Sequence, residues 1–590
     1  MKKIIMTLCV LLWIYHAGKA QILEVQFYDT VRLEVPNTTI GDIQWQFSTN
    51  GETWQDIVNA NTAITKQIVL NSTNYYRAQV TETDCLPVYS AVTQVTGKPV
   101  HLWSNAATWT TGKPTEGSNV IIPAGMTIRL DENPPALGGI TINGELEFAR
   151  KDLQLSAKWI LVHGTFRIGT DEKPFLQKAT VTLTDTNTNE SIMGMGTRGI
   201  MVMGGQLEWH GNPPPVAWTK IQEHAPAGST SIRVLENVTW KTGDEIVIAP
   251  TDYYAAGNGA SITQRLTLTQ VTNQQLNFST PLNAHRWGLL QYPTPTGMSL
   301  SPANVVTPPT PDTPEKKTPL VLDERAEVGH LTRNIVIQAP NDNLWTTQGF
   351  GVHIMLMEAG SVAHVDGVEI KRGGQRGRLA RYAFHWHQLS YSGTQTLADA
   401  TGQYFMNSTI NSSANRGVVV HGTNGVLIKN NVIYDIRGHG VFTEDAVERR
   451  NTFDHNLVLF IRNSTQPLKI HEATVERGSS GFWISNPDNI IINNVAADCR
   501  SIGYWLAFPA QPWGLNQNVV DTRDGQRLAP NRLLFGVFDN NTAHSNGQEG
   551  ILLDDSENDN EGNIFPRQYL STTNGRNPVW PLTTQKRFKL

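Results

Sequence analysis

A short phrase that recurs in the last third of the chain does most to constrain the fold. It reads Asn430-Asn431-Val432, His455-Asn456-Leu457, Asn493-Asn494-Val495 and Asn540-Asn541-Thr542. The apolar runs around it, such as those at residues 418–420 and 426–428, are too short for helices and rich in β-branched side chains. Such runs predict strands of three to five residues joined by tight turns.

The spacing of the phrase indicates a repeat architecture. Asn431 and Asn456 are 25 residues apart, and the longer intervals have room for two turns plus an insertion. A period of roughly 20–25 residues made of short strands is typical of a solenoid. We therefore expect an all-β protein whose residues 346–590 form a right-handed parallel β-helix. Asparagines at equivalent corners can hydrogen-bond from one rung to the next, which predicts an asparagine ladder.

The start of the chain predicts export. Lys2 and Lys3 precede a short apolar run, and Gly18-Lys19-Ala20 offers small residues for cleavage, so residues 1–20 read as a signal peptide. The run is too short to span a membrane, and no Cys follows it to carry a lipid anchor. We expect a secreted, periplasmic or cell-surface protein without a transmembrane segment. The net charge of −5 makes nucleic acid an unpromising partner, and protein partners stay open. Cys85 and Cys499 are expected to be unpaired thiols.

Residues 21–345 divide into three further segments. Residues 21–97, with Trp45 and the pair Tyr75-Tyr76, resemble immunoglobulin-like domains of bacterial proteins and predict a small β-sandwich that acts as a spacer or docking module. Residues 98–222 place glycines between short strands, as in Ile140-Thr141-Ile142-Asn143-Gly144-Glu145. Residues 223–345 are β-rich and contain a Pro-rich loop at 292–320.

The ordered Trp, Pro and Gly positions of residues 98–222, from Trp103-Ser104 through Ile122-Pro123-Ala124-Gly125 to Trp209-His210-Gly211, resemble the eight-glycine domain of a hyaluronidase family. That family comprises the cell migration-inducing and hyaluronan-binding protein, transmembrane protein 2 and their relatives, and the resemblance continues to about residue 560. It implies a calcium-dependent enzyme that degrades hyaluronan. Because the relatives extend further, we expect a truncated solenoid. The leader suggests a bacterial-type member, whose natural glycan can differ from hyaluronan.

His385-Trp386-His387 is the sharpest chemical motif. Alternate residues of a strand project to the same face, so both imidazoles point together while Trp386 points away. Such a pair can bind a metal or transfer protons near neutral pH, and a stacked structural pair is the alternative. With Trp386 buried, both histidines are expected to face solvent. Trp386 and His421 are also candidates for substrate binding.

Carboxylates near this motif supply the other catalytic candidates. Glu444 and Asp445 follow Phe442-Thr443 at a predicted strand end, which suits a carboxylate pair. His439 and Asp454 lie in the same stretch. His455 occupies a ladder position and is predicted to be structural, whereas Glu448, Arg449 and Arg450 read as solvated charges.

Further candidates lie outside that stretch. Asp244 and Asp252 match a phrase of the resembling family, which allows a catalytic or calcium role, with an acidic surface turn as the alternative. Arg376, Arg378 and Arg381, which follow Arg372, form a cationic cluster suited to the carboxylates of a uronate polymer. No loop has a dedicated calcium-ligand spacing, so Ca²⁺ is only weakly indicated and the metal ligands are unknown.

These observations predict an exported glycan-degrading β-helix protein. Because the resembling family is hyaluronidase-like, an endo-hydrolase of hyaluronan or a related polyanionic glycosaminoglycan is the leading hypothesis. Two alternatives stay open: a carbohydrate-binding or adhesin-like surface protein without catalysis, and a lyase acting on a uronate polysaccharide.

Overall fold

A computed structural model describes most of the chain between residues 21 and 566. The described ranges are 21–26, 30–35, 39, 41–68, 73–83, 86–252, 262–294, 297–302, 321–468, 478–520, 525, 527–554, 556–558 and 564–566. The predicted signal peptide, Cys85 and much of the Pro-rich loop lie outside them. The chain forms two compact units, one within residues 1–108 and 126–129 and the other within 109–125 and 130–590. Among the described residues, no helix combines the length and apolarity needed to cross a membrane.

The first unit is a small β module. One sheet has the order β1 (Gln21–Gln26), β8 (Thr93–Lys98), β6 (Thr73–Thr81), β3 (Asp42–Ser48) and β4 (Gln55–Asp56), and β2 (Thr30–Glu34) pairs with β5 (Ile64–Ile68). Trp45 is buried at the centre of its core, and its Nε1 donates to the carbonyl of Thr62 at 2.9 Å. The immunoglobulin-like assignment stays a prediction.

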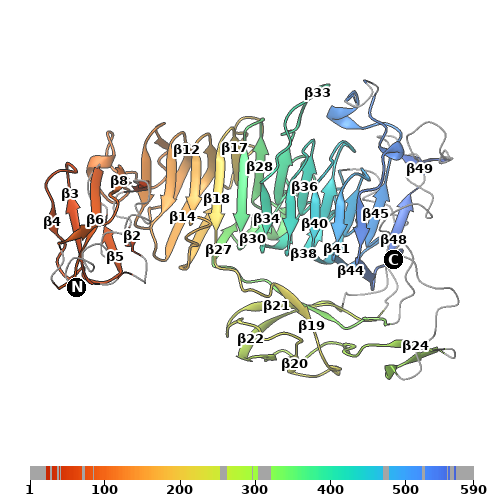
Figure 1. The fold of residues 1–590 in the computed structure, drawn as a ribbon. Coiled ribbons are helices and arrows are strands. Elements are labelled where there is room, and N and C mark those ends of the chain that lie inside the picture. The colour runs from red at the N-terminus through yellow and green to blue at the C-terminus, as the bar shows by residue number, and fades with distance from the viewer. Residues whose placement is uncertain are drawn as a thin grey trace. The chain divides into compact units, whose positions relative to one another are not determined.

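The second unit is a parallel β-solenoid with three rows of strands, here called the first, second and third faces (Figure 1). The first face contains β16 (Ala179–Leu183), β27 (Ile335–Gln338), β30 (Val368–Gly373), β35 (Thr409–Ser413), β38 (Val432–Arg437), β41 (Leu457–Arg462), β44 (Val495–Cys499) and β47 (Thr542–His544). The second contains β17 (Gly199–Met203), β28 (His353–Met357), β31 (Phe384–His387), β36 (Val418–His421), β39 (Val441–Thr443), β42 (Phe482–Ile484), β45 (Tyr504–Ala507) and β48 (Ile551–Asp554). The third contains β13 (Glu145–Phe148), β15 (Thr165–Ile168), β18 (Gln206–His210), β29 (Val362–Asp366), β34 (Tyr404–Met406), β37 (Leu427–Lys429), β40 (Thr452–Asp454), β43 (Ile490–Ile492) and β46 (Val537–Asp539).

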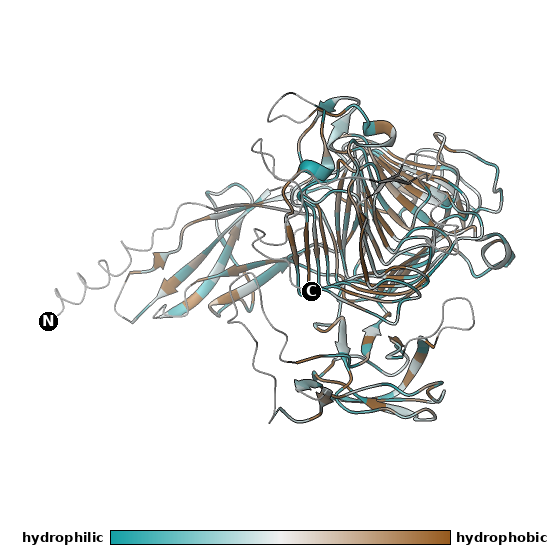
Figure 2. Cartoon of the chain, turned by 90° about the vertical axis from the view of Figure 1, so that its right-hand side faces the viewer, coloured by the Kyte–Doolittle hydropathy of each residue, from teal (hydrophilic) through white to brown (hydrophobic). Residues whose placement is uncertain are grey.

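The solenoid begins well before residue 346. Strands β10 (Val120–Ile122), β12 (Leu137–Ile142) and β14 (Leu153–Val162) open the stack, and β14 pairs with both β16 and β17. Although over 150 residues apart in sequence, β16 pairs with β27 and β17 with β28, in the registers Ala179↔Ile335 and Gly199↔His353. The glycine-rich segment and the later repeats therefore share one continuous stack, in which hydrophobic residues predominate along the strands (Figure 2).

The intervening residues form an inserted antiparallel sheet. Its order is β19 (Trp218–Lys220), β26 (Glu327–His330), β21 (Glu245–Ile248), β22 (Gln264–Thr272), β23 (Gln275–Phe278) and β20 (Ser231–Arg233). Val247, Ala249 and Leu331 pack against Val432, Leu457 and Val495 of the first face. The insertion therefore packs on the first face at β38, β41 and β44.

The asparagine ladder is confirmed. Asn431 donates through Nδ2 to Oδ1 of Asn456 at 2.9 Å, Asn456 to Asn494 at 2.9 Å, and Asn494 to Asn541 at 3.0 Å. The spacing interpretation needs correction, because each interval is a single rung: β38 pairs directly with β41, β41 with β44 and β44 with β47. The extra residues form loops within one turn of the solenoid.

The residues preceding the ladder asparagines form a second ladder with left-handed backbone. Asn430, His455, Asn493 and Asn540 have φ of 56°, 56°, 60° and 54°. His455 contacts Oδ1 of Asn430 through Nδ1 at 2.9 Å and stacks on Trp218 at a ring separation of 4.3 Å. Asn tolerates this conformation better than most residues, which explains its recurrence at the corner.

Candidate functional site

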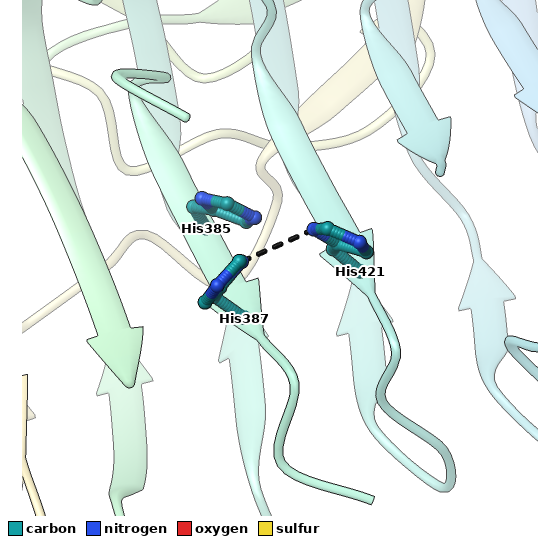
Figure 3. Close-up of side chains that lie close together, drawn as sticks. All are labelled: His385, His387 and His421. Atoms are coloured by element: carbon teal, nitrogen blue, oxygen red, sulfur yellow. Dashed lines mark hydrogen bonds between the residues drawn. The ribbon is translucent and has the colours of Figure 1, made fainter. Parts of the chain in front are cut away.

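Three histidines meet on the second face (Figure 3). In β31 the side chains of Phe384 and Trp386 point into the core, so His385 and His387 project outward together, as their alternation predicts. His387 lies opposite His421 in the β31–β36 register. Parallel stacking thus brings His421 beside the pair although it is 34 residues further along the chain.

His385 is more buried than the sequence suggests. It has none of its surface exposed, because the segment before β31 folds over it and the carbonyl of Ala380 contacts its Nδ1 at 3.1 Å. Its Nε2 is buried without a hydrogen-bond partner. Burial is the main cause that holds the pKa of His385 well below its usual value, and the nearby His387 and His421 add to it. The expectation that both histidines face solvent is therefore wrong for His385, whereas His387 is partly exposed.

His421 carries the positive charge of the cluster. Burial lowers its pKa, but the charges of Glu444 and Asp445 outweigh burial and raise the pKa to about 9. Its Nε2 donates to Oδ2 of Asp445 at 2.9 Å, and its Nδ1 lies 3.1 Å from Nδ1 of His387. Burial, followed by the charge of His421, lowers the pKa of His387 to about 4. At neutral pH His421 is therefore the proton donor to both neighbours.

Glu444 lies at the edge of the cluster between cationic and phenolic groups. Its Oε2 is 3.6 Å from Nδ1 of His421, and its Oε1 is 3.5 Å from the guanidinium of Arg416. The hydroxyl of Tyr382 donates to Oε1 of Glu444 at 3.3 Å and accepts from Arg416 at 3.1 Å. The side chain of Glu444 retains 9 % exposure against 6 % for Asp445, so it is the slightly more open carboxylate of the pair.

Asp445 and Glu448 support the cluster from beneath. Oδ2 of Asp445 accepts from both the backbone and the side-chain amide of Asn516, at 3.2 and 3.0 Å. Glu448 is fully buried and accepts from the backbone amides of Gly422 and Asp445 at 2.8 and 3.0 Å. Burial and then the charge of Asp445 raise the pKa of Glu448 to about 7. Its prediction as an ordinary solvated charge is wrong, because the side chain is fully buried and accepts hydrogen bonds from two backbone amides.

The donor set bears on metal binding. One ligand atom from each of His385, His387 and His421 lies within 4.8 Å of the others, and among the described residues this is the one such grouping of His, Cys, Asp and Glu side chains. Imidazole nitrogen suits zinc and other transition metals, whereas calcium prefers oxygen. The weak expectation of Ca²⁺ stays a prediction.

The two aspartates of the inserted sheet belong to other surroundings. Asp244 bonds to Nε2 of His330 at 2.8 Å and caps the backbone of Lys241 at 2.7 Å. Burial raises its pKa, but these partners outweigh burial and lower it. Asp252 is exposed, and its charge acts on the buried Arg286. In the described part of the chain, neither is hydrogen-bonded or ion-paired to the histidine cluster.

The arginines occupy the loop that precedes β31, and each donates a hydrogen bond to another residue of the chain. Arg376 and Arg378 donate to the carbonyls of Thr347 and Thr188 at 3.0 and 2.7 Å, and Arg381 to Oε1 of Gln375 at 3.1 Å. Their predicted role in binding uronates stays a prediction. Trp386 differs, because its side chain is fully buried and donates to Gln403 at 3.0 Å inside the solenoid. It is a core residue rather than a substrate contact.

The structure also locates the three remaining candidates from the stretch around the histidine motif. His439 is fully buried and contacts Ser480 at 2.8 Å, and Asp454 pairs with Lys429 at 2.8 Å on the third face. His455 has the ladder position described above, and Cys499 is a buried free thiol. Sequence reasoning missed Tyr382 and Arg416, which the chain carries in otherwise unremarkable loop contexts before β31 and β36.

Comparisons with known proteins fit this architecture. Residues 108–222 match the G8 domain family, residues 349–551 the CEMIP beta-helix family, and residues 28–99 a domain of unknown function. The chain is 31 % identical to human Fibrocystin-L over 497 residues, which covers 77 % of this chain and 11 % of that protein. It is also 31 % identical to human Cell surface hyaluronidase CEMIP2 over 378 residues, 58 % of this chain and 24 % of that protein.

The chain spans between about a tenth and two fifths of the lengths of the relatives it matches. Among solved structures, a Family 28 exopolygalacturonase of Yersinia enterocolitica shares 11 % identity, with 93 % of this chain and 84 % of that chain covered. Its TM-score of 0.21 is too low to carry an argument.

Proposed function

We propose, from the premise that this chain belongs with the proteins that combine a G8 domain and a CEMIP β-helix, that it is an exported glycan hydrolase. Its first candidate substrate is hyaluronan or another polyanionic glycosaminoglycan. The name of one relative, Cell surface hyaluronidase CEMIP2, supports that substrate class. The predicted leader and the extracellular location of such polymers support export.

The observation that carries the proposal is the placement of Glu444. Its carboxylate lies against Arg416, Tyr382 and the protonated His421, and retains an exposed edge. The neighbouring imidazolium of His421 can supply a proton. One group that takes up a proton or attacks carbon, beside another that donates a proton, is the minimum set for cleaving a glycosidic bond.

The residues have separate roles in this proposal. Glu444 acts as the general base or nucleophile, and His421 as the proton donor, oriented by Asp445 on its opposite edge. Glu444 and Asp445 therefore act through opposite sides of one imidazole rather than as a facing pair. His387, which is partly exposed, forms the open side of the site. The half-buried arginines 376, 378 and 381 supply positive charge for a polyanion.

Two other functions remain as test outcomes with specific support. A lyase is favoured by Arg416 beside Glu444, because elimination needs a base and a cation for the uronate carboxylate. A binding protein without catalysis is favoured by the burial of His385 and Arg416, which leaves little of the cluster open to a polymer.

The test is the chain length of fluorescent hyaluronan, measured by size-exclusion chromatography after incubation with purified protein. Samples are treated with chelator and reloaded with calcium or zinc, and absorbance near 230 nm is recorded. Shortened chains without new absorbance support a hydrolase, and shortened chains with it identify a lyase. Chains unchanged for hyaluronan, chondroitin, heparan and bacterial polysaccharides would refute enzymatic activity. His455→Asn is the control variant, because it removes a histidine outside the cluster and asparagine already occupies the equivalent corners. It should cleave as the unaltered chain does.

A further inference from the structure

The geometry of the three imidazoles fits a bound ion. Nδ1 of His387 and Nδ1 of His421 are 3.1 Å apart, and the candidate ligand atoms of all three rings lie within 4.8 Å. In a tetrahedral zinc site with Zn–N bonds of about 2.0–2.1 Å, two ligand nitrogens are about 3.3 Å apart. The Nδ1 atoms of His387 and His421 are thus already separated by about the distance expected of two zinc ligands. Of the three histidines, His387 is the one that is partly exposed.

The outer nitrogens of two rings are held as metal ligands require. Nδ1 of His385 faces the carbonyl of Ala380 at 3.1 Å, and Nε2 of His421 faces the carboxylate of Asp445 at 2.9 Å. A histidine that binds a metal usually donates its other ring N–H to a carbonyl or carboxylate, which fixes the tautomer. These contacts leave Nε2 of His385 and Nδ1 of His421 as the available ligand atoms.

A second, independent observation points to a ligand. Nε2 of His385 is fully buried and has no hydrogen-bond partner. Leaving a buried polar atom unsatisfied costs free energy, so native proteins rarely do it without a reason. The fixed tautomer makes this atom a lone-pair donor, and a metal ion would satisfy it.

We propose that His385, His387 and His421 bind a divalent transition-metal ion of the zinc class. Binding of the ion would release the Nδ1 proton that His421 carries in the metal-free chain. The three neutral imidazole nitrogens then favour such an ion over calcium or magnesium, which take oxygen ligands. Glu444, whose Oε2 is 3.6 Å from Nδ1 of His421, would be the carboxylate next to the ligand atoms. The carboxylates of Glu444 and Asp445 balance the charge of the ion. This inference goes beyond the proposed function, and its test does not depend on glycan cleavage. In the metal-bound chain, His421 would no longer be the proton donor of the proposed function, because Nδ1 would bind the ion.

The experiment measures metal binding by the full chain without using activity. Protein stripped with chelator is titrated with ZnCl2 by calorimetry and with CoCl2 by visible absorption, in the presence of excess CaCl2. We expect about one equivalent of zinc per chain and a cobalt spectrum of low coordination number with nitrogen ligands. Excess calcium should not displace either ion.

Variants separate this site from adventitious binding by surface histidines. His387→Ala removes the most exposed ligand and should weaken zinc binding by about 100-fold or more, while Asp445→Asn should weaken it by about 10–100-fold. His455→Asn removes a histidine of the corner ladder and should bind zinc as the unaltered chain does. Circular dichroism establishes that each variant is folded, and His387→Asn replaces His387→Ala if the latter is not.

The results decide the proposal in either direction. Stoichiometric zinc binding that is lost in the His387 variant and kept in His455→Asn supports it. Well under one equivalent bound by the unaltered chain would overturn it, and so would equal binding by the unaltered chain and the His387 variant. Displacement of zinc by calcium would also overturn the assignment of metal class. Because glycan cleavage is not the readout, failure here is distinct from failure of the proposed hydrolase.

Discussion

The asparagine ladder and the histidine cluster use the same solenoid geometry for opposite purposes. In the ladder, Asn431, Asn456, Asn494 and Asn541 each occupy one corner of successive rungs, and each side chain is hydrogen-bonded to its neighbour. In the cluster, stacking brings three imidazoles and several carboxylates together, and the Nε2 atom of His385 has no partner. Identical side chains that hydrogen-bond to one another stabilise a fold. A cluster of imidazoles and carboxylates with opposite charges is instead typical of a functional site.

The largest expected effect is on activity and comes from the cluster. Glu444→Gln keeps the shape of the side chain but removes the charge that the proposed base or nucleophile needs. We expect the rate of hyaluronan shortening to fall by about a thousandfold with little change in the unfolding temperature. Chain-length kinetics at saturating polymer check this prediction, and an unchanged rate would exclude Glu444 as a catalytic residue.

The opposite outcome is expected in the ladder. Asn456→Ala deletes the acceptor of Asn431 and the donor to Ile428 and Asn494, all in a fully buried position. Unsatisfied buried partners should lower the free energy of unfolding by about 4 kcal/mol. Urea unfolding measures the loss. Activity per folded molecule should persist at low temperature, and a loss of activity without a loss of stability would contradict the division of roles.

Glu327, which lies outside both the ladder and the cluster, should make the stability of the fold depend on pH. Burial raises the pKa of Glu327, but His544 and Lys220 outweigh burial and lower it to about 2, against 4.5 for the free side chain. The stabilisation is therefore present above pH 4.5 and is lost as the pH falls toward 2. Glu327→Gln should reduce the free energy of unfolding at pH 7 by on the order of 2–3 kcal/mol.

Unfolding curves at pH 7 and pH 3 check the sign of this effect. The difference between the unaltered chain and Glu327→Gln should be larger at pH 7 than at pH 3. A difference that grows on acidification would show that Glu327 does not gain its stabilisation as an anion.

The smallest effect on stability is expected at position 455, where a histidine stands at a corner that is asparagine in the other rungs. His455→Asn places in the ladder the residue found at the equivalent left-handed positions 430, 493 and 540. It keeps a polar partner for Asn430 but loses the stacking on Trp218. The free energy of unfolding should change by less than about 1 kcal/mol. A large loss in urea unfolding would show that the stacking on Trp218, rather than the ladder, secures this corner.

Much of the fold could be predicted because its signals are local. The repeated Asn-Asn phrase predicts the ladder, and the alternation of His385 and His387 predicts their common direction. The number of rungs could not be read from the spacing, because loops of different length are inserted within single turns. The continuity of β17 with β28 also escaped prediction, since the inserted sheet separates them in sequence.

The site was less predictable because its contacts cross rungs. Arg416 and Glu448 look like surface charges in sequence, yet both are fully buried beside residues from neighbouring turns. The burial of His385 depends on the loop that contains Ala380, whose path no periodicity in the sequence predicts. Only the register between rungs brings His421 opposite His387.

The most direct test of the central claim compares Glu444→Gln with Asn456→Ala in one assay. Hyaluronan shortening per folded molecule is measured at a temperature where both variants remain folded, with the unaltered chain as reference. We predict that Glu444→Gln is folded and nearly inactive, while Asn456→Ala is less stable and active. Equal activity of the two variants would contradict the assignment of catalysis to the second face and of stability to the ladder.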